Sequence, residues 1–518
     1  MKCAYCGKHN KDGAITCKRC GMALPLTPPP VRNDGGDDDL GSVDIGSGGP
    51  SGNKSSGKRT LVAVCAALLA ILLCALIIAL AGRGGNYISP VSGAYNVTDG
   101  TAVFRKGAPV LPELKIADAK TDMSGGKVAV LAENGELYCL PERDTPVARN
   151  VASFTLSRNG KYLIYKDVNG LLWSHACAKK DGAPVCICNS VVKDGYAVSP
   201  DGKSVAYCVE GDPVMHLFSS GKYKELGEGF EPVSVSNGAK HVYAYSAKDN
   251  ALCYINRRGK SVILRSGLRG GVCLNSTHEE AVFTCGFGGN ADSDRAVTLI
   301  SVNGAEPKEI ADSVSGLAPV IPVGAVCMSG SGAQGAVTYP VKSFNNAYFA
   351  GGKLVKYSFR DGTVTIDGAG DCGSAVANKA FDHVYYLNGA RLMSLSTKGK
   401  TISTETLAEN CAGFRISGSG SVQWYLTGEG DLMYRKGSAE KLIAKDVTDL
   451  VVTPSGKEAL FISGGRLCSN TGGNPKRSFV YEGTASALAA DASGLYCRTD
   501  AGWMKLDGGG KKLDLTAE

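Results

Sequence analysis

The sequence has few histidines, and none of the motifs from which common catalytic sites are built. It contains six histidines in 518 residues, and none of them stands in the H-E-x-x-H spacing of zinc hydrolases. A G-x-S-x-G nucleophile motif, a P-loop and a dinucleotide-binding fingerprint in a strand–helix context are also absent. These absences argue against the common hydrolases and nucleotide-binding enzymes. Five histidines fall singly beside expected strands and are expected to be surface or core residues: His175, His216, His241, His278 and His383.

The chain also lacks a strong charge bias. Its net charge of +7 is too small to argue for nucleic acid as a partner. Acidic residues stand mainly at turns such as Asp201-Gly202 and Asp361-Gly362, where Asp bonds the local backbone. Asn290, Asp292 and Asp294 alternate as in calcium loops. The glycine and distal glutamate of an EF-hand are missing, which favours an ordinary polar loop.

One long apolar stretch, residues 61–81, carries no charged side chain. A helix rises about 1.5 Å per residue, so the stretch would span the roughly 30 Å of a bilayer's hydrocarbon core. A buried core helix would interrupt the run with polar residues, and the stretch is long for a signal peptide. We therefore predict one retained transmembrane helix at residues 60–82.

The residues beside this stretch predict its orientation. Lys54, Lys58 and Arg59 precede it, whereas Arg83 alone follows closely. Positive charge near a helix end stays in the cytoplasm, which predicts a single-pass protein of the cell membrane with a cytoplasmic N-terminus and an extracellular C-terminal domain. Alanines at small-xxx-small spacing leave open a homodimer through the helix: Ala63, Ala67, Ala75 and Ala79.

Residues 1–24 contain two C-x-x-C pairs, each followed by glycine. Four thiolates at this spacing can complete a tetrahedral zinc site, and so short a segment buries too little apolar surface to fold without metal. Disulfides or a redox pair are less favoured on the cytosolic side. We expect one structural Zn²⁺ on Cys3, Cys6, Cys17 and Cys20. The segment resembles the short zinc-ribbon at the N-terminus of many bacterial membrane proteins. Residues 25–59, rich in Pro, Gly, Ser and Asp, are expected to form a disordered linker.

From about residue 88 to residue 518, short β-branched and aromatic runs alternate with glycine turns. The best examples are YAVSPDGKSVAYCVEGD (196–212) and VVTPSGKEALFISGGRLCSN (451–470). Each reads as a strand, a Ser/Pro–Asx–Gly turn, a second strand, a glycine turn and a third strand. Such units recur about every 35 to 45 residues, the period of a four-stranded propeller blade. SPDGKSVAY and TPSGKEALF resemble the WD40-like repeats of the TolB and prolyl-oligopeptidase propellers.

The fold class predicted for residues 88–518 is therefore mainly β, a propeller of about eight blades outside the membrane. Residues 319–371 keep the pattern poorly and are either a degenerate blade or an insertion. Residues 88–116 contain VTDGTAVFRKG, a candidate for strands that close the ring with the C-terminal blade. Strand spacing alone does not separate a propeller from a pair of β-sandwich domains, which is the alternative fold.

Cysteines are frequent but do not form one group. Besides the four of the N-terminal pairs and Cys65 and Cys74 of the apolar stretch, the other thirteen of the nineteen are scattered through the outer domain. Most stand where valine or alanine would serve, so we expect small buried hydrophobic residues. A disulfide between Cys186 and Cys188, or between neighbouring blades, is the less favoured alternative.

Two classes of function remain. The first is a membrane-anchored bacterial envelope protein whose extracytoplasmic propeller binds a protein or cell-wall partner. The second is an extracytoplasmic enzyme, for instance one acting on glycans, that uses the propeller channel. The repeats fill the outer domain and leave no second domain for chemistry, so we favour a binding protein without catalytic residues.

Overall fold

The computed structural model describes residues 86–98, 102–142, 145–178, 182–312, 317–329, 333–366, 372–397, 402–481, 485–499, 502–506 and 512–513. The predicted zinc-ribbon with Cys3, Cys6, Cys17 and Cys20, the linker and the predicted transmembrane helix lie outside these residues. No helix within the described part of the chain is long and apolar enough to cross a membrane.

The described strands form eleven sheets, numbered here in chain order. Sheets 1 and 2 have three strands each: β1 (Tyr95–Thr98), β2 (Ala102–Arg105) and β3 (Ala108–Pro109); β4 (Ile116–Thr121), β5 (Val128–Ala132) and β6 (Leu137–Leu140). Sheets 3 to 5 have four each: β7 (Val151–Leu156), β8 (Tyr162–Asp167), β9 (Leu172–Ala176) and β10 (Val185–Cys188); β11 (Val191–Val198), β12 (Ser204–Val209), β13 (Val214–Ser219) and β14 (Lys222–Glu228); β15 (Phe230–Val235), β16 (His241–Ser246), β17 (Ala251–Asn256) and β18 (Ser261–Ser266).

Sheets 6 and 7 share an irregular stretch of chain. Sheet 6 has six strands: β19 (Leu268–Leu274), β20 (Glu280–Gly286), β21 (Ala296–Val302), β22 (Lys308–Asp312), β24 (Met328–Ser329) and β25 (Val337–Thr338). Sheet 7 consists of β23 (Ala318–Pro319), β26 (Ala347–Ala350), β27 (Leu354–Ser358) and β28 (Gly362–Thr365). Short 3₁₀ turns are η1 (Asn237–Ala239), η2 (Phe287–Gly289), η3 (Ala333–Gly335) and η4 (Pro475–Arg477).

Sheets 8 to 11 return to the regular four-stranded pattern. Their strands are β29 (Cys372–Ala377), β30 (His383–Asn388), β31 (Arg391–Ser396) and β32 (Ser403–Ala408); β33 (Gly413–Ile416), β34 (Val422–Leu426), β35 (Leu432–Lys436) and β36 (Ala439–Ala444); β37 (Val447–Val452), β38 (Glu458–Ser463), β39 (Arg466–Thr471) and β40 (Ser478–Tyr481); β41 (Ala487–Asp491), β42 (Gly494–Thr499), β43 (Gly502–Leu506) and β44 (Lys512–Leu513).

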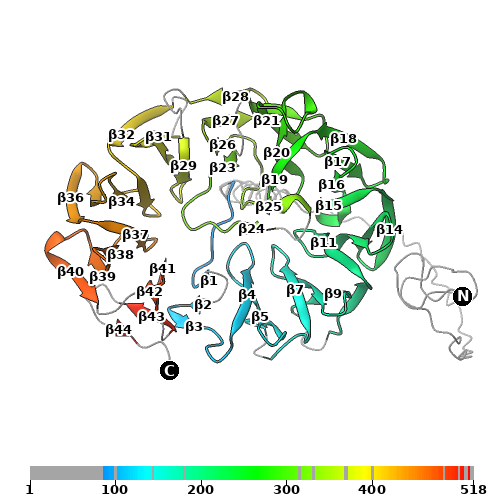
Figure 1. Ribbon diagram of the computed structural model, residues 1–518, viewed down its shortest axis with the longest axis horizontal. Helices are drawn as coiled ribbons and strands as arrows, with labels where there is room; N and C mark the ends of the chain where they lie inside the picture. The colour runs from blue at the N-terminus through cyan, green and yellow to red at the C-terminus, as the bar shows by residue number, and fades with distance from the viewer. Residues whose placement is uncertain are drawn as a thin grey trace, which may run out of the picture.

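The eleven sheets stand around a ring, each with its first strand toward the centre (Figure 1). Within a sheet, strands pair antiparallel in chain order, and sheet 6 alone of the described sheets also contains a parallel pair, β19 with β25. Apolar side chains fill the spaces between neighbouring sheets; Tyr207 of sheet 4, for example, packs with Ile164 and Leu172 of sheet 3. The core is therefore a series of inter-sheet layers, as expected for blades that cannot bury their own faces.

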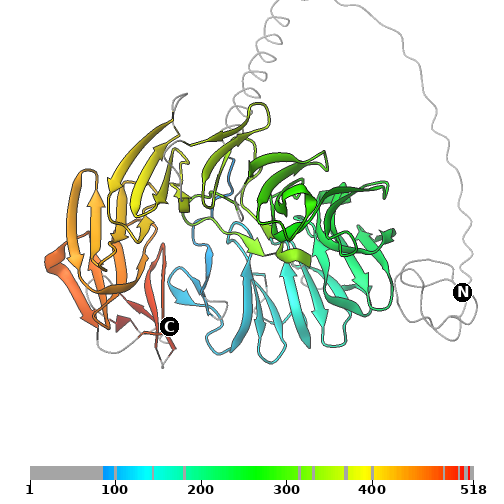
Figure 2. The same cartoon turned by 45° about the horizontal axis from the view of Figure 1, so that its top comes forward.

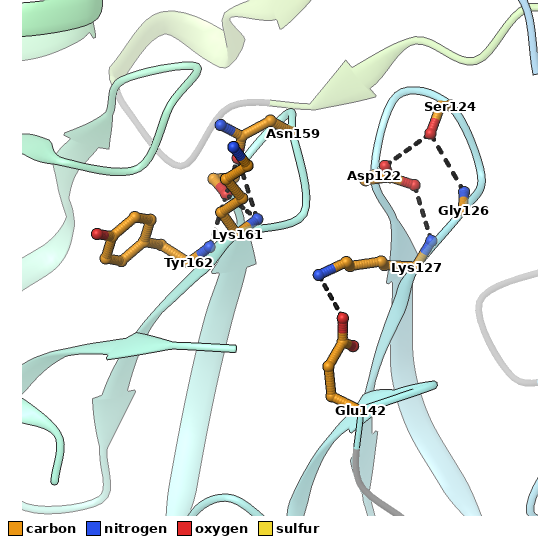
Figure 3. Close-up of polar contacts among 9 residues, drawn as sticks. Asp122, Ser124, Gly126, Lys127, Glu142, Asn159, Lys161 and Tyr162 are labelled. Atoms are coloured by element: carbon orange, nitrogen blue, oxygen red, sulfur yellow. Dashed lines mark hydrogen bonds and ion pairs between the residues drawn. The ribbon is translucent and has the colours of Figure 1, made fainter. Parts of the chain in front are cut away.

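The turn between the first two strands of a sheet is held by a side chain that precedes it. Ser199 Oγ accepts a hydrogen bond from Ser204 N at 3.0 Å, and Ser417 Oγ accepts one from Val422 N at 3.1 Å. In sheet 2 Asp122 takes this role, accepting from Lys127 N at 3.0 Å, while the Lys127 side chain pairs with Glu142 (Figure 3). These Ser and Asp positions are the first residues of the repeated turn motif, which explains why that motif recurs.

These turns also connect each sheet to the next. Met123 N donates to Arg158 O at 3.0 Å, and Gly418 N donates to Pro454 O at 2.7 Å. Trp424, fully buried, donates from Nε1 to Gly456 O of the next sheet at 3.0 Å. A chain of contacts therefore links successive turns along one face of the ring. We call this face, with its first-to-second and third-to-fourth strand loops, the turn face.

The ring closes by packing between sheets 1 and 11, which lie side by side in Figure 1. Phe104 of β2 stacks on Tyr496 of β42 with ring centroids 4.6 Å apart, and it contacts Trp503 edge-on at 5.8 Å. β1, β2 and β3 pair only with one another within the described residues. The prediction that residues 88–116 lend strands to the last blade was therefore wrong: these residues form a sheet of their own.

The predicted propeller is confirmed, but the predicted number of eight blades was wrong, because the described residues form eleven sheets. Sheets 1 and 2 have three described strands each and therefore lack the four-stranded pattern by which blades are recognised in the sequence. Residues 319–371 hold most of sheet 7, whose first strand is separated from its second by residues 320–346. The β-sandwich alternative was also wrong, since the sheets follow one another around a ring rather than facing in pairs.

Candidate functional site

The centre of the ring is crossed by the chain itself. The described residues 317–329 and 333–346, here the crossing segment, leave sheet 7, pass through the middle and return (Figures 1 and 2). At one end Val323 N donates to Ala377 O, and Ala377 N donates to Ile321 O, both at 2.9 Å. At the other end β25 pairs in parallel with the inner strand β19. The segment therefore occupies the inner edges of sheets 8 and 6.

A buried histidine fixes the segment to the wall. His278 Nε2 lies 2.8 Å from Thr338 Oγ1 of β25, and its Nδ1 lies 3.1 Å from Val235 O of sheet 5. Complete burial lowers the pKa of His278 to about 4, so the imidazole is neutral at ordinary pH. One ring nitrogen then donates and the other accepts, which satisfies both contacts.

Two clefts lie beside the crossing segment. The first, of about 280 Å³, lies between sheets 2 and 3 and residues 326–329 of the segment. Lys120 reaches its wall, pairing with Asp118 at 3.1 Å and donating to Phe154 O at 3.0 Å. Cys327, an exposed residue, belongs to the same cleft, and burial raises the pKa of its thiol to about 11. The lining of this cleft is mixed, and its one acid and one base are paired with each other.

The second cleft, of about 390 Å³, lies between Val323 of the crossing segment and the inner strands of sheets 8 to 11. Val376, Phe414 and Ile416 give it apolar walls, and Ser374 and Arg415 are exposed polar groups beside them. The described residues that line it include no carboxylate. An apolar trough with one fixed cation and backbone at its wall suits an uncharged or acidic ligand.

Backbone groups at the channel are available in most sheets. β33 and β37, which line the second cleft, each have a neighbouring strand on one side only among the described elements. Their inner edges thus present N–H and C=O groups toward the cleft. Several inner strands also contain register shifts, as between Cys372 and Ala375, and the residues between them, Gly373 and Ser374, are exposed.

Hydrolysis of a glycan by the usual route needs two carboxylates facing each other across a cleft. Among the described lining residues, the first cleft offers Asp118, which is paired with Lys120, and the second offers none. No group of three or more His, Cys, Asp or Glu that could hold a metal occurs within the described part of the chain.

The isolated histidines have structural surroundings, as the sequence predicts. His216 is buried and its Nε2 lies 3.0 Å from Asp212 Oδ2, while His241 Nδ1 lies 2.9 Å from Tyr254 OH. His175 is buried in β9, and His383 begins β30 at the end of a turn. In the polar loop, Asn290 Oδ1 accepts from Asp292 N at 3.0 Å, which is a local turn contact.

The thirteen cysteines of the ring are free thiols. Ten are buried, including Cys139, Cys253 and Cys497, which confirms their role as small apolar residues. Burial raises the pKa of Cys253 and Cys372 to about 11 and thereby suppresses the thiolate. Cys186 and Cys188 do not form the disulfide considered above; Cys186 Sγ instead contacts Cys188 O at 3.7 Å.

Charge is distributed unequally between the two faces of the ring. Exposed basic residues in or beside the described loops of the turn face are Lys161, Lys203, Lys222, Lys240, Arg257, Arg258, Lys260, Lys342, Arg360, Lys379, Lys436, Lys457 and Lys476, against exposed acids Glu306 and Asp361. On the opposite face, exposed acids Glu113, Glu133, Glu210, Glu228, Asp249, Asp292, Asp294, Glu409, Glu429 and Asp446 accompany exposed bases Lys115, Arg149, Lys248, Arg295, Arg391, Lys445 and Arg466. The turn face is therefore strongly basic, although the whole chain is not.

Sequence reasoning missed the polar residues of the channel. Lys120 and Arg415 stand in strand patterns with no motif around them, and only the ring brings them to the clefts. The sequence signal that was available is the loss of repeat pattern across 319–371, which marks the crossing segment.

No protein-family model matches the chain, and no curated protein matches it either. Among solved structures, a eukaryotic initiation factor is 10% identical with a TM-score of 0.37, over 75% of this chain and 95% of that chain. The tricorn protease is 9% identical with a TM-score of 0.28, over 76% and 47%. Hydrazine synthase of Kuenenia stuttgartiensis is 13% identical with a TM-score of 0.27, over 56% and 96%. Likenesses this slight do not bear on what the chain does.

Proposed function

We propose that the chain is a single-pass protein of the bacterial cell membrane, with a zinc-ribbon in the cytoplasm and a propeller outside that binds another envelope protein. The membrane helix and its orientation rest on the uncharged residues 61–81 and on the basic residues before them. The zinc-ribbon rests on the spacing of Cys3, Cys6, Cys17 and Cys20.

The observation that carries the binding role is the crossing segment. It is an extended piece of polypeptide lying in the channel, and it is held by backbone pairing to the inner edge of β19. The inner edges of β33 and β37 offer the same kind of contact beside the 390 Å³ cleft. An extended segment of a partner protein would add to such an edge, with side chains alternating into the apolar wall. Arg415 would favour an acidic side chain in that segment.

Photo-crosslinking in living cells tests this role. A photoreactive residue replacing Ser374, which is exposed in the second cleft, should join the full-length chain to one defined envelope protein. The same residue replacing Ser421, which is exposed in a turn outside the clefts, is the matched control. Arg415→Glu should reduce the crosslink at position 374. Crosslinks only to cell-wall glycan, or equal crosslinking from both positions, would contradict binding of a protein segment in this cleft.

A further inference from the structure

The chain enters the ring at the turn face. Asn86, the first described residue, exchanges hydrogen bonds with Ser343, and Lys342 N donates to Asn86 O at 2.8 Å. Tyr87 stacks on Phe381 of the sheet 8 turn with centroids 4.2 Å apart. Farther along, Val91 N donates to Ser124 O of the sheet 2 turn at 2.9 Å. The entry point is therefore fixed to the crossing segment and to turns of sheets 8 and 2, and cannot swing to the other face.

The tether before Asn86 is short. If the predicted transmembrane helix ends at residue 82, four Cα-to-Cα steps separate its end from Asn86. Steps of about 3.8 Å place Asn86 within roughly 15 Å of the membrane surface. Asn86, and the part of the turn face around it, then lie within about two Debye lengths of the headgroups, since that length is about 8 Å at physiological salt.

The same face is the basic one. Its most basic part lies in sheets 4 and 5, where the third-to-fourth strand loop of sheet 5 contains Arg257, Arg258 and Lys260, all exposed. Lys240 and Lys203 are exposed in neighbouring turns. Lys224 Nζ donates to Arg257 O at 2.6 Å, which joins the two sheets at this point. Cations placed this close to anionic headgroups are attracted to them, by an amount that grows with each residue.

Resting on the proposed membrane anchor, we infer that the turn face docks on anionic phospholipid headgroups of the membrane that the chain's own helix crosses. The docked ring lies flat on the membrane, with the opposite face and its mixed charges pointing away. Docking fixes which end of the channel an outside partner enters, namely the end on the opposite face. The channel clefts and the docking surface are then separate sites on one ring.

The test compares hydrogen–deuterium exchange of the full-length chain in two kinds of nanodisc, neutral phosphatidylcholine and phosphatidylcholine with a third phosphatidylglycerol. Amides at residues 203, 240 and 257–260 should exchange several-fold more slowly in the anionic discs, while loops of the opposite face should not change. The protection should vanish in about 1 M salt, where the Debye length is about 3 Å. Equal exchange in both discs, with the chain inserted, would overturn docking and leave the anchor standing. Failure of the chain to insert in either disc would overturn the anchor and docking together.

Two charge-reversal variants, one on each face of the ring, test whether the protection depends on the basic residues of the turn face. Arg257→Glu with Arg258→Glu should abolish the slower exchange at residues 203, 240 and 257–260 in the anionic discs. Arg391→Glu with Lys445→Glu makes the same charge change at exposed residues of the opposite face and should leave that protection unchanged. Equal loss in both pairs would mean a general charge effect and would overturn docking by the turn face.

Discussion

Asn86 and Ser343, 257 residues apart in the chain, hold each other by two hydrogen bonds: Asn86 Nδ2 donates to Ser343 O at 2.5 Å, and Ser343 N donates to Asn86 Oδ1 at 3.0 Å. Ser343 Oγ in turn donates to Glu280 at 2.8 Å. The pair thus joins the point where the chain enters the ring to the end of the crossing segment and to sheet 6.

Replacing Asn86 with Ala should destabilise the ring by about 1–3 kcal/mol, because the partly buried N–H and C=O of Ser343 both lose their partner. Urea unfolding of the full-length chain in detergent, followed by tryptophan fluorescence, measures the loss. Asn134→Ala removes a similar two-bond contact at an exposed loop and should cost well under 1 kcal/mol. Equal unfolding midpoints for the two variants would contradict the role of Asn86.

Close packing between turns of neighbouring sheets can be tested at Gly456. A Cβ added there would lie 2.7 Å from Ser417 Cβ, in the sheet before it, and the residue has φ +72°. Gly465 in the same sheet has φ +76° but nothing within 4 Å of an added Cβ. Both alanine variants carry the same backbone strain, so the difference between them reports the contact. We expect Gly456→Ala to cost about 2 kcal/mol more in urea unfolding; equal costs would show that the turns are not tightly packed.

His278 should make the stability of the ring depend on pH. Its pKa is about 4 in the folded chain, below the ordinary value of about 6.5, because burial disfavours the charged imidazolium. The unfolded chain therefore binds the extra proton between these values. The free energy of unfolding is not lowered by this titration above pH 6.5. It should fall by up to roughly 3 kcal/mol as the pH drops to 4.

The His278→Gln variant lacks this titration and isolates the effect. Other groups titrate in the same window, and burial raises the pKa of Glu280, whose contribution changes with pH in the opposite sense. The quantity to compare is the difference in unfolding free energy between the two proteins at pH 6.5, 5.5 and 4.5. A difference that stays constant over this range would contradict a neutral, buried His278.

Zinc content tests the N-terminal cysteines. The full-length chain, purified at neutral pH, should contain one zinc ion per chain, held by Cys3, Cys6, Cys17 and Cys20. Cys17→Ser should lose most of it, because three thiolates leave the site incomplete, whereas Cys139→Ser in the ring should keep it. Elemental analysis measures the zinc content. A chain that contains no zinc would contradict the predicted zinc-ribbon.

The sequence predicts the propeller because the turn between the first two strands of a sheet is formed by a short motif of neighbouring residues. In the turn that begins at Ser199, the Ser199 hydroxyl accepts a backbone hydrogen bond and donates one to Asp201, and Gly202 has positive φ. These residues are neighbours in the chain, so the turn can be recognised from the sequence. Blade number is harder, because it depends on sheets that lack the motif. Strand β23 meets β26 only after residues 320–346, and no local rule predicts that excursion.

The channel could not be predicted for a related reason. Arg415 lines the second cleft only because β33 is the inner strand of its sheet and the crossing segment passes beside it. Those two facts are properties of the closed ring. The basic turn face is likewise invisible in the net charge, because its lysines and arginines are spread over many turns and balanced by acids of the other face.

Cys327 allows the most direct test of an outward-facing ring with an open channel. It is exposed at the first cleft, unlike the ten buried cysteines of the ring. A membrane-impermeant maleimide, added to intact spheroplasts at alkaline pH because burial raises the pKa of the Cys327 thiol to about 11, should label the peptide that contains Cys327, and Cys327→Ser should abolish that label. Labelling of Cys327 only after the membrane has been permeabilised would place the ring inside the cell and contradict the account.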